Sequence, residues 1–369
     1  MATSTNTSTY TRFTTAQDTV DSIDRVFASA WSGITPNNDL GAAHFSSSTQ
    51  YVTTSPTSSG AFYMEIYSTN PQSDTSAEPQ YSIAYGSKTG LGGLDFNDET
   101  GAANFSPTKA IYSQYRNLVF GGDETQNFSF DGHTPDDIYI ININRARYKN
   151  ALRMGNLTLN LSGSMLNQKQ LLKLTDDSVT TSGSANAIRA GVGREFNLVS
   201  GSNGVRLGAS NTYVTNSGSY GYVYPDAGFI ILNADALDHS GSAAAFALGG
   251  GGINLGTDTT EDNDSQNPVL LQNALTLGGS FILDSQEDIA SKFYFVRVFN
   301  QDFNYSTNDS FTVTDGTLSF DSMIDNPQVY ITTVGLYNDN QDLLAVAKLS
   351  QPLPKNYTKE ALIKVKLDY

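Results

Sequence analysis

The chain has 369 residues, no cysteine and a formal net charge of −16, and only 16% of its residues are charged. It therefore has no disulfide, thiolate metal site or thiol nucleophile, and its acidic balance argues against binding to nucleic acid or anionic membranes, which requires clustered Lys and Arg. It has no run of 18 apolar residues and no apolar secretory signal, so we expect a protein made in a cytoplasm without a membrane span.

The N-terminal region is predicted to hold an arm and a helix. Residues 1–15 are rich in Ser, Thr and Asn and carry too little apolar surface to fold alone, which indicates an extended arm. A helix is predicted from Asp18 to Gly33, because apolar residues recur there at helical spacing. These residues are Val20, Ile23, Phe27, Ala30 and Trp31. Trp31, the only tryptophan, is expected to pack this helix onto a sheet.

Short strands and a second helix are predicted next. Residues 51–54, 61–67 and 81–85 are typical of short strands broken by Ser, Pro and Asn. Ser106 followed by Pro107 indicates a helix start, and Gly121 with Gly122 indicates its end. The apolar face of this helix is expected to comprise Ile111, Tyr115, Leu118 and Val119.

In the middle of the chain, residues 137–148 (DIYIININRARY) predict a strong strand, expected to pair with residues 157–162. Residues 171–216 are more polar, with weak strands at 195–199 and 213–215. The run 222–232 is again apolar, with Pro225 at an edge or bulge. Residues 243–264 form a Gly/Ala-rich segment that leads into an acidic loop.

The last third shows the clearest strands, at 293–299, 329–337, 343–349 and 361–369. In the final strand apolar residues from Ala361 to Tyr369 alternate with Leu362, Lys364, Lys366 and Asp368, which predicts a half-exposed antiparallel sheet. Within residues 331–349 we expect a hairpin in which Val334 and Leu336 pair with Leu344 and Val346 across a polar turn.

These elements predict a mainly β protein, with an antiparallel β-sandwich-like C-terminal domain and an N-terminal α+β region containing two short helices. The expected divisions are an arm at 1–15, an α+β region at 16–165, a loop-rich β region at 166–280 and the C-terminal β domain at 281–369. No repeat with a period of 20 to 50 residues indicates a solenoid or propeller.

Residues able to carry out catalysis or bind metal are sparse. His44, His133 and His239 are far apart in sequence and show no metal-ligand spacing, so turn or surface positions are favoured. A weak calcium candidate comprises Asp258, Glu261, Asp262 and Asp264, although a solvated acidic loop is the favoured interpretation. The glycines at 249–252 lack the spacing of a phosphate-binding loop. No cofactor is expected.

Paired carboxylates are the remaining catalytic candidates, since glycan-cleaving enzymes use two. Asp136 with Asp137 and Asp176 with Asp177 are such pairs. Adjacent strand residues point to opposite faces, whereas glycosidase carboxylates must face each other across a bond. A pair assembled from distant segments stays open.

Two groups of residues are candidates for binding a partner. Arg145, Arg147 and Lys149 are spaced by two, which in a strand lines one face with positive charge and suits a carboxylate-rich neighbouring subunit. An ordinary solvated face is the equal alternative. Tyr220, Tyr222 and Tyr224 have the same spacing and, if exposed, provide stacking surfaces for a glycan.

Several blocks resemble virion structural proteins of T4-like contractile-tailed phages of marine cyanobacteria. These blocks are FYFVRVFNQDFNYSTN at 293–308, the segment 330–369, SPTKAIYSQYRNLVFGGDE at 106–124, DDIYIININRARYK at 136–149 and YGYVYPDAGFIILNADALD at 220–238. The segment 331–349 also resembles a strand–turn–strand unit of contractile-tail fibre and baseplate attachment domains. The resemblance implies assembly and supplies no catalytic motif.

We therefore expect a non-enzymatic structural subunit of a phage virion, assembled in the tail near the baseplate with copies of itself and other tail proteins. A neck position at the head–tail junction is the second alternative. A receptor-binding adhesin that recognises a glycan and a glycan-cleaving enzyme are the alternatives from other classes.

Overall fold

The computed structural model describes residues 15–31, 44–46, 51–52, 63–67, 71, 74–93, 106–165, 168–207, 219–239, 251–260, 266–276, 279–305 and 309–369. The chain forms two compact units, a large unit of residues 26–287 and a small unit of residues 1–25 with 288–369. Strands account for 47% of the structure and helices for 15%, which confirms the predicted mainly β class. The chain passes between the units within β1 (Thr19–Ser29) and within β16 (Asp284–Val298).

The large unit is built on one antiparallel sheet of thirteen strands. Its strands follow the order β2, β15, β8, β9, β11, β13, β14, β6, β5, β4, β3, and β10 and β12 pair with β11. Their bounds are β2 His44–Ser46, β3 Tyr51–Val52, β4 Tyr63–Tyr67, β5 Pro79–Ser87, β6 Asp137–Ile143, β8 Thr158–Met165, β9 Gln168–Asp176, β10 Ala187–Arg189, β11 Gly193–Ser202, β12 Val205–Arg206, β13 Gly221–Tyr224, β14 Phe229–Asn233 and β15 Ser280–Ile282.

The central strands of this sheet are buried on both faces. In β6, Tyr139 and Ile141 belong to the main core, whereas Ile138 and Ile140 belong to a second core on the opposite face. Successive strand residues point to opposite faces, so a strand covered on both sides is apolar almost throughout. This explains the apolar run 138–141 of β6.

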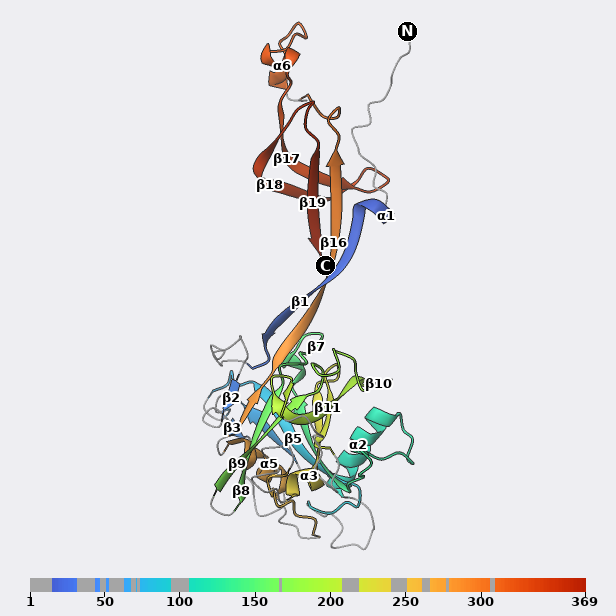
Figure 1. Cartoon of the computed structure of the whole chain (residues 1–369), viewed down its shortest axis with the longest axis vertical. Coiled ribbons are helices and arrows are strands. Elements are labelled where there is room, and N and C mark those ends of the chain that lie inside the picture. The colour runs from blue at the N-terminus through green and yellow to red at the C-terminus, as the bar shows by residue number, and fades with distance from the viewer. Residues whose placement is uncertain are drawn as a thin grey trace. The chain divides into compact units, whose positions relative to one another are not determined.

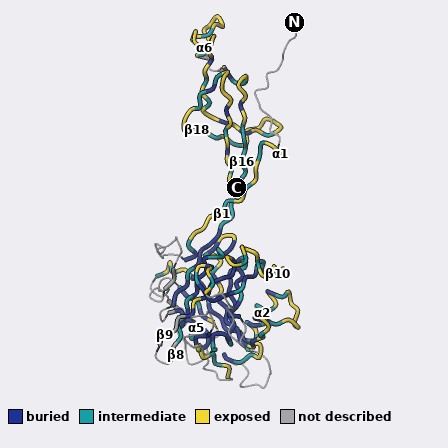
Figure 2. Tube along the Cα trace, viewed as in Figure 1, coloured by how far each residue is buried: buried dark blue, intermediate teal, exposed yellow. Residues whose placement is uncertain are grey.

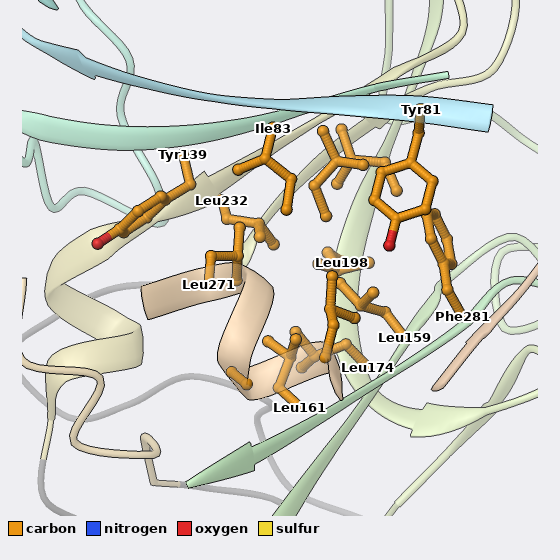
Figure 3. Packing of buried hydrophobic residues seen from close by; sticks show 14 of the residues in the cluster. Tyr81, Ile83, Tyr139, Leu159, Leu161, Leu174, Leu198, Leu232, Leu271 and Phe281 are labelled. Atoms are coloured by element: carbon orange, nitrogen blue, oxygen red, sulfur yellow. The ribbon is translucent and has the colours of Figure 1, made fainter. Parts of the chain in front are cut away.

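The main core lies inside the sheet, which curls so that strands near its two ends meet. Tyr81 of β5 and Phe281 of β15 lie with ring centroids 5.5 Å apart, and Trp31 contacts both rings at 5.6 and 5.0 Å. The Trp31 indole Nε1 donates to the Phe281 carbonyl at 3.1 Å. Helix α5 (Asn267–Thr276) contributes Leu271 to the same core, as Figure 3 shows.

The second core lies under helix α2 (Pro107–Phe120), which confirms the predicted second helix. Tyr112 and Val119 are buried there, and Gly121 ends the helix in the left-handed conformation, with φ 72°. Among the described residues of the large unit, three further short elements lie outside the sheet. They are η2 (Arg145–Arg147), β7 (Ala151–Leu152), which pairs with β16, and α3 (Ala234–Asp238).

The small unit is a two-layer β structure. β16 lies between β1 and β19 (Ala361–Asp368), and a hairpin of β17 (Val329–Tyr337) and β18 (Leu343–Lys355) packs on one face of β16 and β19 (Figure 1). The remaining elements are α1 (Thr15–Asp18), η3 (Asp309–Phe311) and α6 (Ser322–Asp325). Alternating burial along β19 confirms its predicted period of two.

Several predicted elements are wrong. Residues 19–29 form β1 instead of a helix, since Val20, Ile23 and Phe27 remain exposed and no apolar helical face is buried. Trp31 nevertheless packs on strands, as expected. β8 pairs with β9 and β15 and not with β6. The run 222–232 is a hairpin with Pro225 in its turn.

The domain divisions also differ from the prediction. β8 and β9 pair across residues 165 and 166, so the predicted boundary there falls inside one sheet. The boundary expected at 281 lies at 288, inside the continuous strand β16, where no turn marks it. Of the predicted arm and the strand at 213–215, only Thr15 is among the described residues.

We predict that Phe281→Ala lowers the free energy of unfolding of the large unit by about 3–5 kcal/mol, because it opens a cavity where the two ends of the sheet meet. Urea unfolding followed by the fluorescence of Trp31, the only tryptophan, measures this change. Ile188→Ala is the control, since Ile188 is 81% exposed, and it should change stability by less than about 0.5 kcal/mol. Equal effects of the two variants would contradict the assigned closure.

Candidate interaction surface

The first predicted carboxylate pair does not form a joint site. Asp136 is exposed and lies 3.4 Å from the Lys88 ammonium. Asp137 is buried, and its Oδ1 accepts a hydrogen bond from the Tyr85 hydroxyl at 2.7 Å. Burial raises the pKa of Asp137 above its ordinary value. The two carboxylates thus lie in separate surroundings, because adjacent strand residues point to opposite faces of a sheet.

The second predicted pair is structural. Both Oδ atoms of Asp176 accept from the Gly155 backbone N–H at 2.9 Å, and Ser178 donates to the same carboxylate through N–H and hydroxyl. Asp177 accepts from the N–H of Asn197 at 3.1 Å and from its amide at 2.8 Å. Burial raises the pKa of both carboxyl groups. Each carboxylate holds a neighbouring loop, and neither faces the other.

We predict that, as pH rises, the free energy of unfolding of the wild type falls relative to that of the Asp137→Asn variant. The folded-state pKa of Asp137 is raised, so its stabilising contribution is complete below the unfolded-state pKa of about 3.9 and is lost as pH rises through the folded-state value. The variant keeps an acceptor for Tyr85 but has no charge to titrate. Urea unfolding between pH 3.5 and 7 should show a slope difference of at most about 1.4 kcal/mol per pH unit.

Asp136→Asn is the matched control for this experiment, because it removes the adjacent exposed carboxylate and should leave the wild-type slope in place. A slope difference for Asp136→Asn, or parallel pH curves for wild type and Asp137→Asn, would be inconsistent with the assignment.

The histidine and calcium candidates do not converge. His133 Nε2 lies 2.7 Å from Asp235 Oδ2, His239 follows α3, and His44 is in β2. Asp258 Oδ1 accepts from the N–H and hydroxyl of Thr260, and Glu261, Asp262 and Asp264 lie outside the described residues. Within the described part of the chain, no group of three or more His, Asp or Glu side chains can hold a metal ion.

The predicted basic stripe is wrong, because β6 ends at Ile143 and Arg145–Arg147 is a 3-10 turn. The Asn144 side chain accepts from the Ala146 N–H and begins this turn. Arg147 pairs with Glu78 at 2.6 Å, and Arg145 donates to the Tyr148 carbonyl. Lys149 is exposed, and a role in binding a partner stays a prediction.

The predicted tyrosine platform is also wrong. Tyr220 and Tyr224 are fully buried, and Tyr222 is partly buried, because both faces of β13 are covered by core residues. Their hydroxyls donate within the chain, to the Gly251 carbonyl, the Glu195 carboxylate and the Ser129 carbonyl. These tyrosines therefore belong to the cores and offer no exposed row for a glycan.

The exposed apolar surface is concentrated in the small unit. Of the 23 large apolar side chains that are exposed among the described residues, 15 belong to the small unit. Its own core cluster has only three buried members, Val334, Leu336 and Val365. Figure 2 shows the same contrast, with buried residues concentrated in the large unit. Large uncovered apolar patches mark surfaces that bind other molecules.

The hairpin β17–β18 carries one such surface on its outer face, called here the hairpin patch. It comprises Tyr337, Leu343, Leu344 and Val346. Val346 lies opposite Gly335 in the hairpin. The Tyr337 ring and Leu343 lie over Gly335, since a Cβ added at Gly335 would come within 2.9 Å of the ring and 3.3 Å of Leu343. Leu344 and Val346 are 68% and 59% exposed.

The predicted hairpin exists, but its predicted side-chain pairing is wrong. Val334 pairs with Ala347 and Leu336 with Ala345, and a register irregularity follows between Leu336 and Tyr337. Leu344 and Val346 therefore point outward. β18 is apolar on both faces near the turn, so its sequence left the register open. Ala345 and Ala347 have the same spacing of two as Leu344 and Val346, so the sequence also allowed Val334 and Leu336 to pair with the two alanines.

Comparison with known proteins adds no family assignment, since the chain matches no family model and neither a curated protein nor a solved structure is significantly similar to it. Among the described residues, no helix is long and apolar enough to cross a membrane.

Proposed function

We propose that the chain is a non-enzymatic structural subunit of a phage virion that assembles in the tail, in or near the baseplate. The observation that carries this proposal is the small unit, which holds 15 of the 23 large apolar side chains that are exposed among the described residues and buries few of its own. A unit of this kind gains stability when a neighbouring molecule covers it.

The two units suit different roles in an assembly, the large unit for stability and the small unit for binding neighbours. The large unit has a closed main core and a second core under α2, so it folds around its own apolar side chains. The small unit offers the hairpin patch and strand edges, which are the features that proteins use to add neighbours. The resemblance of residues 293–308 and 330–369 to phage tail proteins falls within this same unit.

The contacts made by the candidate catalytic carboxylates support an assembly role over an enzymatic one. Asp137, Asp176 and Asp177 are bound to hydroxyl, amide or backbone donors that fix local structure. The tyrosines proposed for glycan binding lie in the cores. Baseplate is the first position proposed, on the resemblance of residues 331–349 to attachment domains, and the neck is the second.

Cryo-electron microscopy of intact particles that contain the chain tests its proposed location. A symmetric reconstruction should place the chain in the tail at the baseplate, with the small unit against a neighbouring molecule. Density in the neck would move the subunit to the second position. Density at distal fibre tips alone, or none in the particle, would overturn the structural role and favour an adhesin or a soluble protein.

We predict that Leu344→Asp with Val346→Asp abolishes incorporation of the chain into particles, because two charges enter a surface that assembly covers. Since both side chains are exposed, the isolated variant should keep its stability within about 1 kcal/mol. Quantitative mass spectrometry of purified particles measures incorporation, and thermal unfolding measures stability.

Thr332→Asp is the matched control, since Thr332 is exposed on the same hairpin but outside the patch, and it should be incorporated normally. Val334→Asp places a charge in the small-unit core and should unfold that unit. Normal incorporation of the double variant would rule out the hairpin patch as an assembly surface.

A further inference from the structure

Strand β1 is a long edge strand with one open side. It stands at the end of the strand order β1, β16, β19, and among the described residues β16 is its only strand partner. An open edge presents backbone N–H and C=O groups that can pair with another strand. Proteins commonly block such edges with Pro, with charged side chains, especially Lys, or with a short strand. β1 has 11 residues and contains neither Pro nor Lys, and its charged residues Asp21, Asp24 and Arg25 are paired with residues of the same chain.

The side chains of β1 are poorly covered within the chain. Ile23 is 65% exposed, and Val20 and Val26 are also exposed. Besides its backbone pairing with β16, β1 contacts its neighbours through three ion pairs between exposed or partly exposed side chains, Asp21 with Lys292, Asp24 with Lys366 and Arg25 with Asp288. Such pairs contribute little to stability. The strand therefore has apolar and backbone groups that remain to be covered.

The order of residues in β1 is complementary to itself when reversed. In an antiparallel pair with Ile23 facing its own counterpart, Asp21 of each copy faces Arg25 of the other, so two opposite-charge pairs form. Ser22 then faces Asp24, and a serine hydroxyl can donate to a carboxylate. Directly opposite residues in antiparallel strands share a face of the sheet, so all of these contacts are geometrically allowed.

We propose that β1 pairs antiparallel with β1 of a second copy, with Ile23 on the two-fold axis. The two sheets then join into one continuous sheet whose main path runs in the order β19, β16, β1, β1, β16, β19, with β7 of each copy paired to its own β16. A two-fold interface uses the same surface on both copies, as this self-complementary strand requires. This inference rests on the proposed function for its expectation of a partner, and it names that partner as a second copy.

Charge reversal in the full-length chain tests the pairing, with sedimentation velocity over a range of concentrations as the measurement. Wild type should form dimers. Asp21→Arg places arginines opposite each other at both contacts, and Arg25→Asp places aspartates there, so each variant should weaken the dimer by about tenfold or more. The double variant D21R/R25D should restore dimers, and a mixture of the two single variants should form heterodimers.

The double variant separates pairing between copies from contacts within the chain. In it the side chains at 21 and 25 still carry the wrong charge for Lys292 and Asp288, so the intrachain pairs stay broken. Recovery of the dimer can therefore come only from the restored contacts between copies. Circular dichroism of each variant confirms that it is folded.

A single introduced cysteine provides a second test, because the natural chain has none. Ile23→Cys puts the two thiols opposite each other at the axis, so mild oxidation should link two copies. Ser22→Cys is the control, since position 22 faces position 24 and should link far more slowly.

The β1 pairing would be overturned by a monomeric wild type, by dimers that are insensitive to the charge reversals, or by a lack of recovery in D21R/R25D. The last result would point to another edge such as β19. These failures are distinct from failure of the proposed function. A chain located in the tail but monomeric in solution overturns only the pairing, whereas a charge-dependent dimer absent from particles overturns only the virion role.

Discussion

The contact among Trp31, Tyr81 and Phe281 is the constraint on which the rest of the fold depends. It joins strands from the two ends of a thirteen-stranded sheet, so the sheet closes around its own apolar face with α5 inside. β1 ends two residues before Trp31, and β16 begins three residues after Phe281. Both strands that lead into the small unit therefore start from this aromatic cluster, which anchors them at the large unit.

The two units differ in how completely they bury their apolar side chains. The large unit covers both faces of its central strands, and its buried carboxylates Asp137, Asp176 and Asp177 accept hydrogen bonds from hydroxyl, amide and backbone donors. The small unit has one thin core between the hairpin and two strands, and its outer surfaces carry the hairpin patch and β1. In the proposed role, the large unit provides stability and the small unit provides the surfaces for assembly, which suits a subunit that must fold before it binds its neighbours.

The sequence predicted elements whose pattern reflects burial on one side or a local end signal. β17 and β19 were placed by composition and alternation, and α2 by Ser106–Pro107 and Gly121. β1 was mistaken for a helix because neither of its faces is buried, so no alternation was imposed and helical spacing arose by coincidence. Tyr220, Tyr222 and Tyr224 were candidates for a glycan platform if exposed, and the spacing of two could not reveal that both faces of β13 are covered. The hairpin patch was missed because β18 is apolar on both faces and the irregularity after Leu336 is not encoded by a distinctive residue.

Hydrogen–deuterium exchange of the free chain and of the chain in assembled particles tests the central claim, that the small unit is completed by its neighbours. The account predicts slow exchange in β6 and β14 in both states, because the large unit is complete alone, and marked slowing in β1, β17 and β18 on assembly. Unchanged exchange in all three small-unit strands, or slowing confined to the large unit, would contradict it.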